Sequence, residues 1–146
     1  MRIPVYFSRF FFCSFILVTG FLSLNLQAQE IKPFTSDGCS AFPDGTYEQN
    51  QLWLKCCTAH DYAYWKGGTY QQRVEADKAL EECVADLGQE VVALLMHTGV
   101  RIGGAPYWPT PFRWGYGWSF PRDYGELTAE ELKQVKKESH KLKKVD

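Results

Sequence analysis

Residues 56–64 place two adjacent cysteines, a histidine, an aspartate and two tyrosines within nine positions. On a helix, His60 and Tyr64 share one face, and Cys56 lies one turn before His60. Cys57 and Asp61 lie on the flanking faces, so one short helix can direct a base, a carboxylate and two cysteines in separate directions. A buried histidine beside a satisfied carboxylate is the alternative, but the neighbouring cysteines favour a chemical role.

The first 28 residues differ from the rest of the chain. Arg2 and Arg9 accompany a mainly apolar run over residues 10–26, and Ala28 offers a small residue for cleavage, which is typical of a secretory signal peptide. The alternative is an uncleaved membrane anchor, because Leu26 is larger than the residue preferred three positions before the cut. The apolar run is nevertheless shorter than the roughly 20 residues that span a bilayer. We therefore expect a secreted or periplasmic protein.

Composition and charge exclude several classes of protein. The 146 residues are 45% hydrophobic and 16% aromatic, which suffices for one domain with a core. Cleavage after Ala28 removes Arg2 and Arg9, leaving 14 basic against 17 acidic residues, a net charge of −3. This charge disfavours nucleic-acid binding. We expect a monomer.

Four cysteines lie beyond the signal segment, at positions 39, 56, 57 and 83. Exported proteins normally oxidise their thiols, so we expect two disulfides, for which three pairings are open. A bond between the adjacent Cys56 and Cys57 has poor geometry within a helix. A zinc site built from Cys56, Cys57 and His60 is a rival, but adjacent cysteines in an exported chain favour disulfides.

The pattern of apolar residues predicts a mainly α fold. Residues 29–45 carry turn signals, and helices are predicted over about residues 47–65 and 70–87, followed by residues 91–100. The short link between the first two helices predicts an antiparallel pair. Thr128 and Glu131 form a capping box that opens a Lys-rich helix in the C-terminal segment, residues 126–146.

Residues 107–121 contain seven aromatic side chains. Trp114, Tyr116, Trp118 and Phe120 alternate with small residues, which predicts a short β-hairpin or an extended flap with one aromatic face. These rings either cover the core or form a surface that contacts a ligand or an interface.

Asp77 falls within the apolar stripe of the second predicted helix, where an unpaired carboxylate would be costly. We expect His60 to be its partner, because the carboxylate would then fix the imidazole tautomer and leave the other nitrogen to accept a proton from water. Asp61 lies on another face and is available for a cation. Arg73 shares a face with Asp77; we expect a surface arginine, with pairing to Asp77 as the alternative.

One pattern joins both predicted helices: Cys-Cys-x-x-His-Asp-x-x-Tyr at residues 56–64, then Asp77, then Cys83 six residues later. It resembles the signature of the secreted, calcium-dependent phospholipase A2 superfamily, over residues 37–83. The resemblance implies the disulfides Cys56–Cys83 and Cys39–Cys57. Animal members carry a further disulfide where this chain has Ala63 and Ala76, so the chain is similar to a divergent, bacterial-like member with fewer crosslinks.

The resemblance also implies an activity and its cofactor. In a phospholipase A2-like domain over residues 29–125, His60 would activate water, Asp77 would orient His60, and Tyr64 would support Asp77. The reaction would hydrolyse the sn-2 ester of glycerophospholipids at a membrane surface or lipid aggregate.

The calcium site implied by the resemblance combines the Asp61 carboxylate with three carbonyls of an irregular loop. Those carbonyls belong to Gly38, Ser40 and Phe42, and oxygen ligands suit Ca²⁺. The loop lacks several glycines that the family has. The alternative is a non-catalytic lipid- or glycan-binding protein on the same scaffold.

Overall fold

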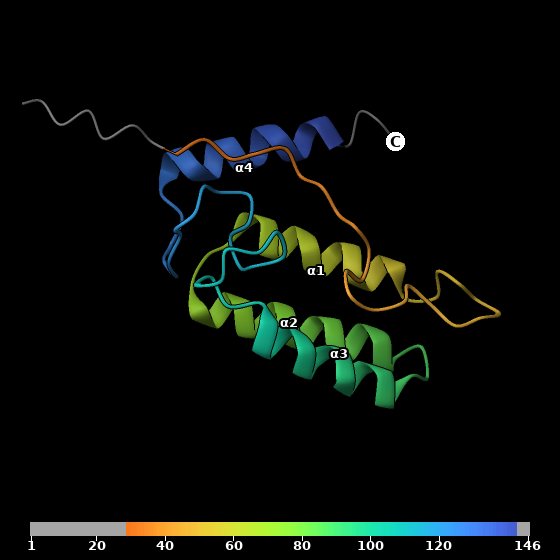
Figure 1. The fold of residues 1–146 in the computed structure, drawn as a ribbon. Helices are drawn as coiled ribbons and strands as arrows, with labels where there is room; N and C mark the ends of the chain where they lie inside the picture. Colours follow the sequence, from red (N-terminus) through yellow and green to blue (C-terminus); the bar gives the residue numbers. More distant parts are fainter. Residues whose placement is uncertain (1–28, 143–146) are drawn as a thin grey trace, which may run out of the picture.

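The computed structural model describes residues 29–142, so the expected signal peptide of residues 1–28 lies outside the described residues. The described chain is mainly helical, as predicted, and contains four helices and no strand (Figure 1). The helices are α1 (Leu54–Lys66), α2 (Tyr70–Ala85), α3 (Glu90–Gly103) and α4 (Ala129–Leu142). None of these four helices has the length and apolar character needed to span a membrane.

The first helix begins later than predicted, at Leu54 rather than near residue 47. The backbone N–H of Trp53 donates to the carbonyl of Asp44 at 3.1 Å, and its indole N–H donates to Pro43 at 2.6 Å. These bonds fold residues 43–53 into turns, so the apolar spacing before Leu54 reflects a packed loop. The helix ends at Lys66, and the residue that follows it, Gly67, has a φ of 67° in the left-handed region.

Capping boxes open two of the other helices. Thr69 and Gln72 exchange hydrogen bonds at the start of α2, at 3.1 and 2.9 Å. The predicted box of Thr128 and Glu131 is confirmed at the start of α4, with bonds of 3.2 and 2.8 Å. The third helix is longer than predicted at both ends. The local sequence of each capping box therefore indicates where α2 and α4 begin.

Two disulfides connect the helices, and both expected pairs are present. Cys56–Cys83 joins α1 to α2, and Cys39–Cys57 joins the upstream loop to α1, each with an S–S distance of 2.02 Å. Because both sulfurs of the rival zinc site are in disulfides, neither is available as a thiolate ligand.

Two buried clusters flank α1. One contains residues of α1, α2 and α3, including Cys56, Leu80 and Met96. The other joins Trp65 of α1 to Ile31, Trp118 and Val135 of α4. In Figure 1, α1 accordingly lies between α4 on one side and α2 with α3 on the other.

The aromatic segment does not form the expected β-hairpin. Residues 107–121 form successive turns instead. The indoles of Trp114 and Trp118 donate to the carbonyls of Gly68 and Lys66, at 2.8 and 2.7 Å. The buried guanidinium of Arg113 donates to the carbonyls of Gly115 and Trp118, both at 2.7 Å. The Arg113 side chain thus satisfies two carbonyls of this segment that would otherwise have needed partners on a neighbouring strand.

Candidate active site

His60 and Asp77 meet between α1 and α2. The Nε2 atom of His60 lies 2.9 Å from Oδ1 of Asp77, and the Asp77 side chain is 0% exposed. The apolar positions that bury one side of α2 place Asp77 opposite α1, and the Cys56–Cys83 disulfide links the same two helices. The structure therefore brings together the two residues that the sequence predicted to pair.

Tyr64 also contacts Asp77. Its hydroxyl donates to Oδ1 at 2.7 Å, one helical turn beyond His60. Burial, with the nearby charge of Asp77, raises the pKa of Tyr64, so the phenol keeps its proton as a donor. This is the supporting position expected for Tyr64.

Two arginines lie close to the other carboxylate oxygen of Asp77. Arg101 of α3 donates from Nη1 to Oδ2 at 2.7 Å, and Nε of Arg73 lies 3.7 Å from the same oxygen. The expectation that Arg73 lies on the surface is wrong, because its side chain is only 3% exposed. Its guanidinium donates to the Tyr64 hydroxyl at 3.0 Å and to the carbonyls of Val100 and Arg101 at 2.8 and 2.9 Å. Burial is tolerated because these acceptors satisfy the donors.

Arg101 is the site residue that sequence reasoning missed. Its only local signal is a basic residue in the last turn of a helix, which by itself indicates the helix dipole. Its contact with Asp77 depends on how α3 packs against α2.

The surroundings of Asp77 keep its carboxylate ionised. Burial alone would raise the pKa of Asp77, but hydrogen bonds from His60, Tyr64 and Arg101 outweigh burial and lower the pKa. Asp77 is therefore negatively charged at neutral pH, where it stabilises a proton on Nε2 of His60.

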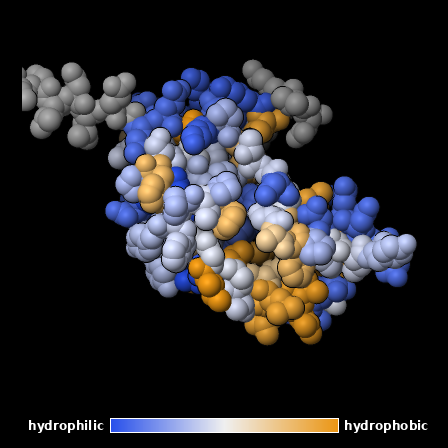
Figure 2. Space-filling model, in the orientation of Figure 1, coloured by the Kyte–Doolittle hydropathy of each residue, from blue (hydrophilic) through white to orange (hydrophobic). Residues whose placement is uncertain are grey.

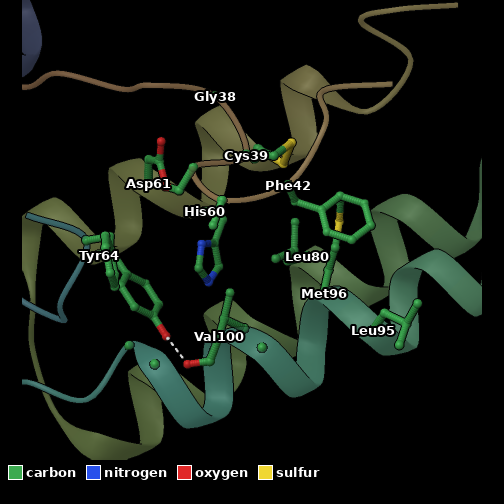
Figure 3. A pocket seen from close by; sticks show the side chains of 17 residues that line it. Gly38, Cys39, Phe42, His60, Asp61, Tyr64, Leu80, Leu95, Met96 and Val100 are labelled. Carbon is green, nitrogen blue, oxygen red and sulfur yellow. Dashed lines mark hydrogen bonds between the residues drawn. A yellow bond between two sulfur atoms is a disulfide. The ribbon is translucent and has the colours of Figure 1, made fainter. Parts of the chain in front are cut away.

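The imidazole of His60 borders a cavity of about 370 Å³. Within residues 29–142, its Nδ1 atom has no hydrogen-bond partner. Figure 3 shows the imidazole extending from α1 toward α3, between the Tyr64 ring and Leu80. The rest of the lining is mainly apolar and includes Phe42, Leu80, Leu95, Met96, Val100 and Phe112. A long apolar group can therefore lie beside the free nitrogen of His60.

Asp61 lies at the rim of the same cavity, next to the loop tethered by Cys39. Ser36 donates to Asp61 Oδ2 at 2.6 Å. Burial raises the pKa of Asp61 to about 6, and the charges of Asp37 and Asp44 add to the increase. A cation bound here would offset this unfavourable concentration of negative charge.

The calcium ligands expected from the sequence also line this cavity: Gly38, Ser40 and Phe42. In the described part of the chain, no three His, Cys, Asp or Glu side chains form a group that could hold a metal ion. A cation would therefore depend on carbonyl oxygens together with Asp61. Gly38 and Ser40 have φ values of 78° and 54°, so the loop turns sharply at this point. Oxygen donors of this kind suit calcium in their chemistry.

Comparison with known proteins gives no match: neither a protein-family model, nor a curated protein, nor a solved structure matches this chain.

Proposed function

We propose that this protein is a calcium-dependent, phospholipase A2-like hydrolase that cleaves the sn-2 ester of glycerophospholipids. The observation that carries the proposal is the His60–Asp77 pair beside an apolar cavity, with the free nitrogen of His60 unpaired among the described residues. The position of Asp61 at the rim supports a cation next to the same cavity.

The chain supplies the base for water attack. Nδ1 of His60 takes a proton from water while the water oxygen attacks the ester carbonyl. Asp77 holds the proton on Nε2 and stabilises the imidazolium that forms, and Tyr64 and Arg101 hold Asp77 in place. The imidazolium then protonates the leaving alkoxide, which gives a fatty acid and a lysophospholipid without a covalent acyl-enzyme.

Calcium contributes electrostatic stabilisation in this proposal. The Asp61 carboxylate and the carbonyls of Gly38, Ser40 and Phe42 would hold the ion, and when bound it supplies Lewis-acid polarisation of the ester carbonyl. The raised pKa of Asp61 supports this assignment, because a cation is the partner that a half-buried carboxylate among acidic neighbours needs.

The fold supports an antiparallel arrangement of α1 and α2. Three residues connect these helices, and Cys56 near the start of α1 is bonded to Cys83 near the end of α2. We assign residues 29–125 to the catalytic unit and residues 126–146 to a C-terminal segment. This segment contains α4, whose Val135 packs near Trp65. The disulfides support export, to the periplasm or the medium.

The decisive experiment is release of sn-2 fatty acid from phosphatidylcholine by the purified protein, in calcium chloride and in excess EDTA. We expect calcium-dependent release that falls by about 10²–10⁴-fold in His60→Gln, since a general base contributes a factor of this size. His97→Gln is the matched control, because His97 lies on α3 near Glu81 and is not among the residues that line the cavity. Full activity of a folded His60→Gln protein would exclude the mechanism.

The non-catalytic alternative predicts a different result. Lipid would bind without ester cleavage, and His60→Gln would leave binding unchanged. The mainly apolar lining of the cavity favours a lipid rather than a glycan as the ligand in that case.

A further inference from the structure

The third helix is apolar on its outer side as well as on its buried side. Val91, Leu94, Leu95 and Ile102 are 74%, 58%, 58% and 74% exposed. At 100° per residue these four positions fall within a sector of about 100° on one face. Ala93 and Met96 are buried on the side that faces α2. Exposed apolar stripes of this kind mark interaction surfaces.

This outer stripe continues into the cavity beside His60. Leu95 lines the cavity although it is largely exposed, and so does Phe112, which is 44% exposed. We call Val91, Leu94, Leu95, Ile102 and Phe112 the α3 patch. Figure 2 shows hydrophobic residues gathered over α3 at the lower edge of the molecule. An apolar group that leaves the cavity at this edge passes directly onto the α3 patch.

The α3 patch carries little free positive charge. The guanidinium of Arg101 is bound to Asp77 and to the Tyr70 hydroxyl. His97 lies near Glu81, and the cavity rim on the loop side carries Asp61. Of the seven exposed lysines within residues 29–142, four lie on α4, namely Lys133, Lys136, Lys137 and Lys141. In Figures 1 and 2, α4 forms the opposite, hydrophilic edge of the molecule.

We propose that the α3 patch docks on a zwitterionic phospholipid bilayer and inserts its side chains among the acyl chains. The choice of phospholipid as occupant rests on the proposed function; the location rests on the patch and its continuity with the cavity. Leu95 and Phe112 stand where an acyl chain would pass from the bilayer toward His60. A second copy of this chain on the same face would instead cover the mouth of the cavity. Docking through α3 also directs the α4 lysines away from the bilayer, so anionic lipid contributes little.

The test is sedimentation with phosphatidylcholine vesicles in EDTA, where calcium cannot bridge protein and lipid. We expect binding that is insensitive to salt between about 0.05 and 0.5 M, because apolar insertion is not screened. Leu94→Glu/Ile102→Glu should weaken binding at least about tenfold, since each leucine-sized side chain gains about that factor on burial. Leu132→Glu is the matched control, because Leu132 is 45% exposed on α4, and should bind as the wild type.

Three results would overturn the proposal. Unchanged binding in the α3 double variant would place the contact elsewhere. Binding that requires anionic lipid, and that Lys136→Glu/Lys137→Glu abolishes, would assign the contact to α4. A dimer that Leu94→Glu dissociates would assign the patch to self-association. Circular dichroism and thermal melting would establish that the variants are folded.

A separate assay distinguishes this proposal from the proposed function. Hydrolysis of a short-chain phosphatidylcholine below its micelle concentration reports on His60 without a bilayer. Vesicle binding that needs the α3 patch, with no hydrolysis of either substrate, would uphold the docking surface and reject the enzyme. Hydrolysis of the soluble ester, with vesicle binding that does not change when the α3 patch is altered, would uphold the enzyme and reject the docking surface.

Discussion

Arg101 donates a hydrogen bond from Nη1 to Oδ2 of Asp77 across the α2–α3 interface, at 2.7 Å. The other oxygen of Asp77 faces His60 and Tyr64. One carboxylate thus connects all three helices that surround the cavity. The charge that would support an imidazolium on α1 is held in place by a residue of α3.

Replacing Arg101 by Met should reduce hydrolysis more than about tenfold, because Asp77 loses the donor that fixes its outer oxygen. The free energy of unfolding should fall by about 1–3 kcal/mol, the range for leaving a buried polar group less satisfied. Arg101→Lys should recover part of both losses. Arg122→Met is the control, since Arg122 pairs with Glu131 near α4 and should lower stability alone. Urea unfolding and kcat measurements would check this, and equal kcat in the Arg101→Met and Arg122→Met variants would contradict it.

Gly104→Ala should destabilise the protein and reduce activity. A Cβ at Gly104 would lie 2.6 Å from the Tyr64 hydroxyl and 2.8 Å from the backbone oxygen of Val100. Overpacking of this kind costs about 1–3 kcal/mol, and the displaced Tyr64 would lose its bond to Asp77. Gly103→Ala is the neighbouring control, because a Cβ at Gly103 would have no heavy atom within 4 Å. Thermal melting should give a lower Tm for Gly104→Ala than for Gly103→Ala. Equal Tm values would show that the Tyr64 side chain can move to accommodate the added methyl group without loss of stability.

Asp61 should make stability fall with rising pH over its titration range. Its native pKa of about 6 exceeds the ordinary value of 3.8 because of burial. The native state therefore holds more protons than the unfolded chain between about pH 4 and 6, and the free energy of unfolding decreases as pH rises through that window. Asp61→Asn should remove this decrease and be the more stable protein above pH 6.

Denaturation in EDTA from pH 4 to 8 would measure the effect, with Asp123→Asn as the control for loss of one exposed negative charge. The difference between wild type and Asp61→Asn is the informative quantity, because Asp77 has a lowered pKa and contributes with the opposite sign. Parallel stability curves for the wild type and Asp61→Asn would reject the assignment.

The two disulfides should contribute similarly to stability and differently to activity. They close segments with sequence separations of 18 and 27, and removing either should cost about 3 kcal/mol. Cys39→Ala/Cys57→Ala should also abolish most calcium-dependent hydrolysis, because the loop beside Asp61 loses its tether. Cys56→Ala/Cys83→Ala should retain more activity at a temperature where both variants are folded. The reverse order of activities would refute a role for the loop in holding calcium.

Much of the helical framework could be predicted because its signals are local. Gly67 and Thr69 mark the end of α1 and the start of α2, and Thr128 with Glu131 marks α4. The pairing of His60 with Asp77 could also be predicted, because a carboxylate in an apolar stripe needs a partner nearby. The structure brings these two residues together at 2.9 Å.

The remaining features depend on contacts that no local pattern specifies. Apolar spacing before Leu54 suggested a longer helix, but the Trp53 indole is bonded to Pro43 ten residues upstream. Alternating aromatics suggested a strand, but the buried Arg113 satisfies the carbonyls of that segment. Arg101 could be placed beside Asp77 only once α3 had been packed on α2. The burial of Arg73 depends on the same packing, because its guanidinium donates to the carbonyls of Val100 and Arg101.

A second cavity, of about 120 Å³, lies between α1 and α2 behind His60. Its lining includes the four alanines at positions 59, 63, 76 and 79. The separation of these helices is therefore set by covalent and hydrogen-bonded links, at Cys56–Cys83 and at Asp77, rather than by bulky side chains between them. Substitutions at the four alanines offer a way to adjust the distance from base to carboxylate while every group of the site keeps its chemical identity.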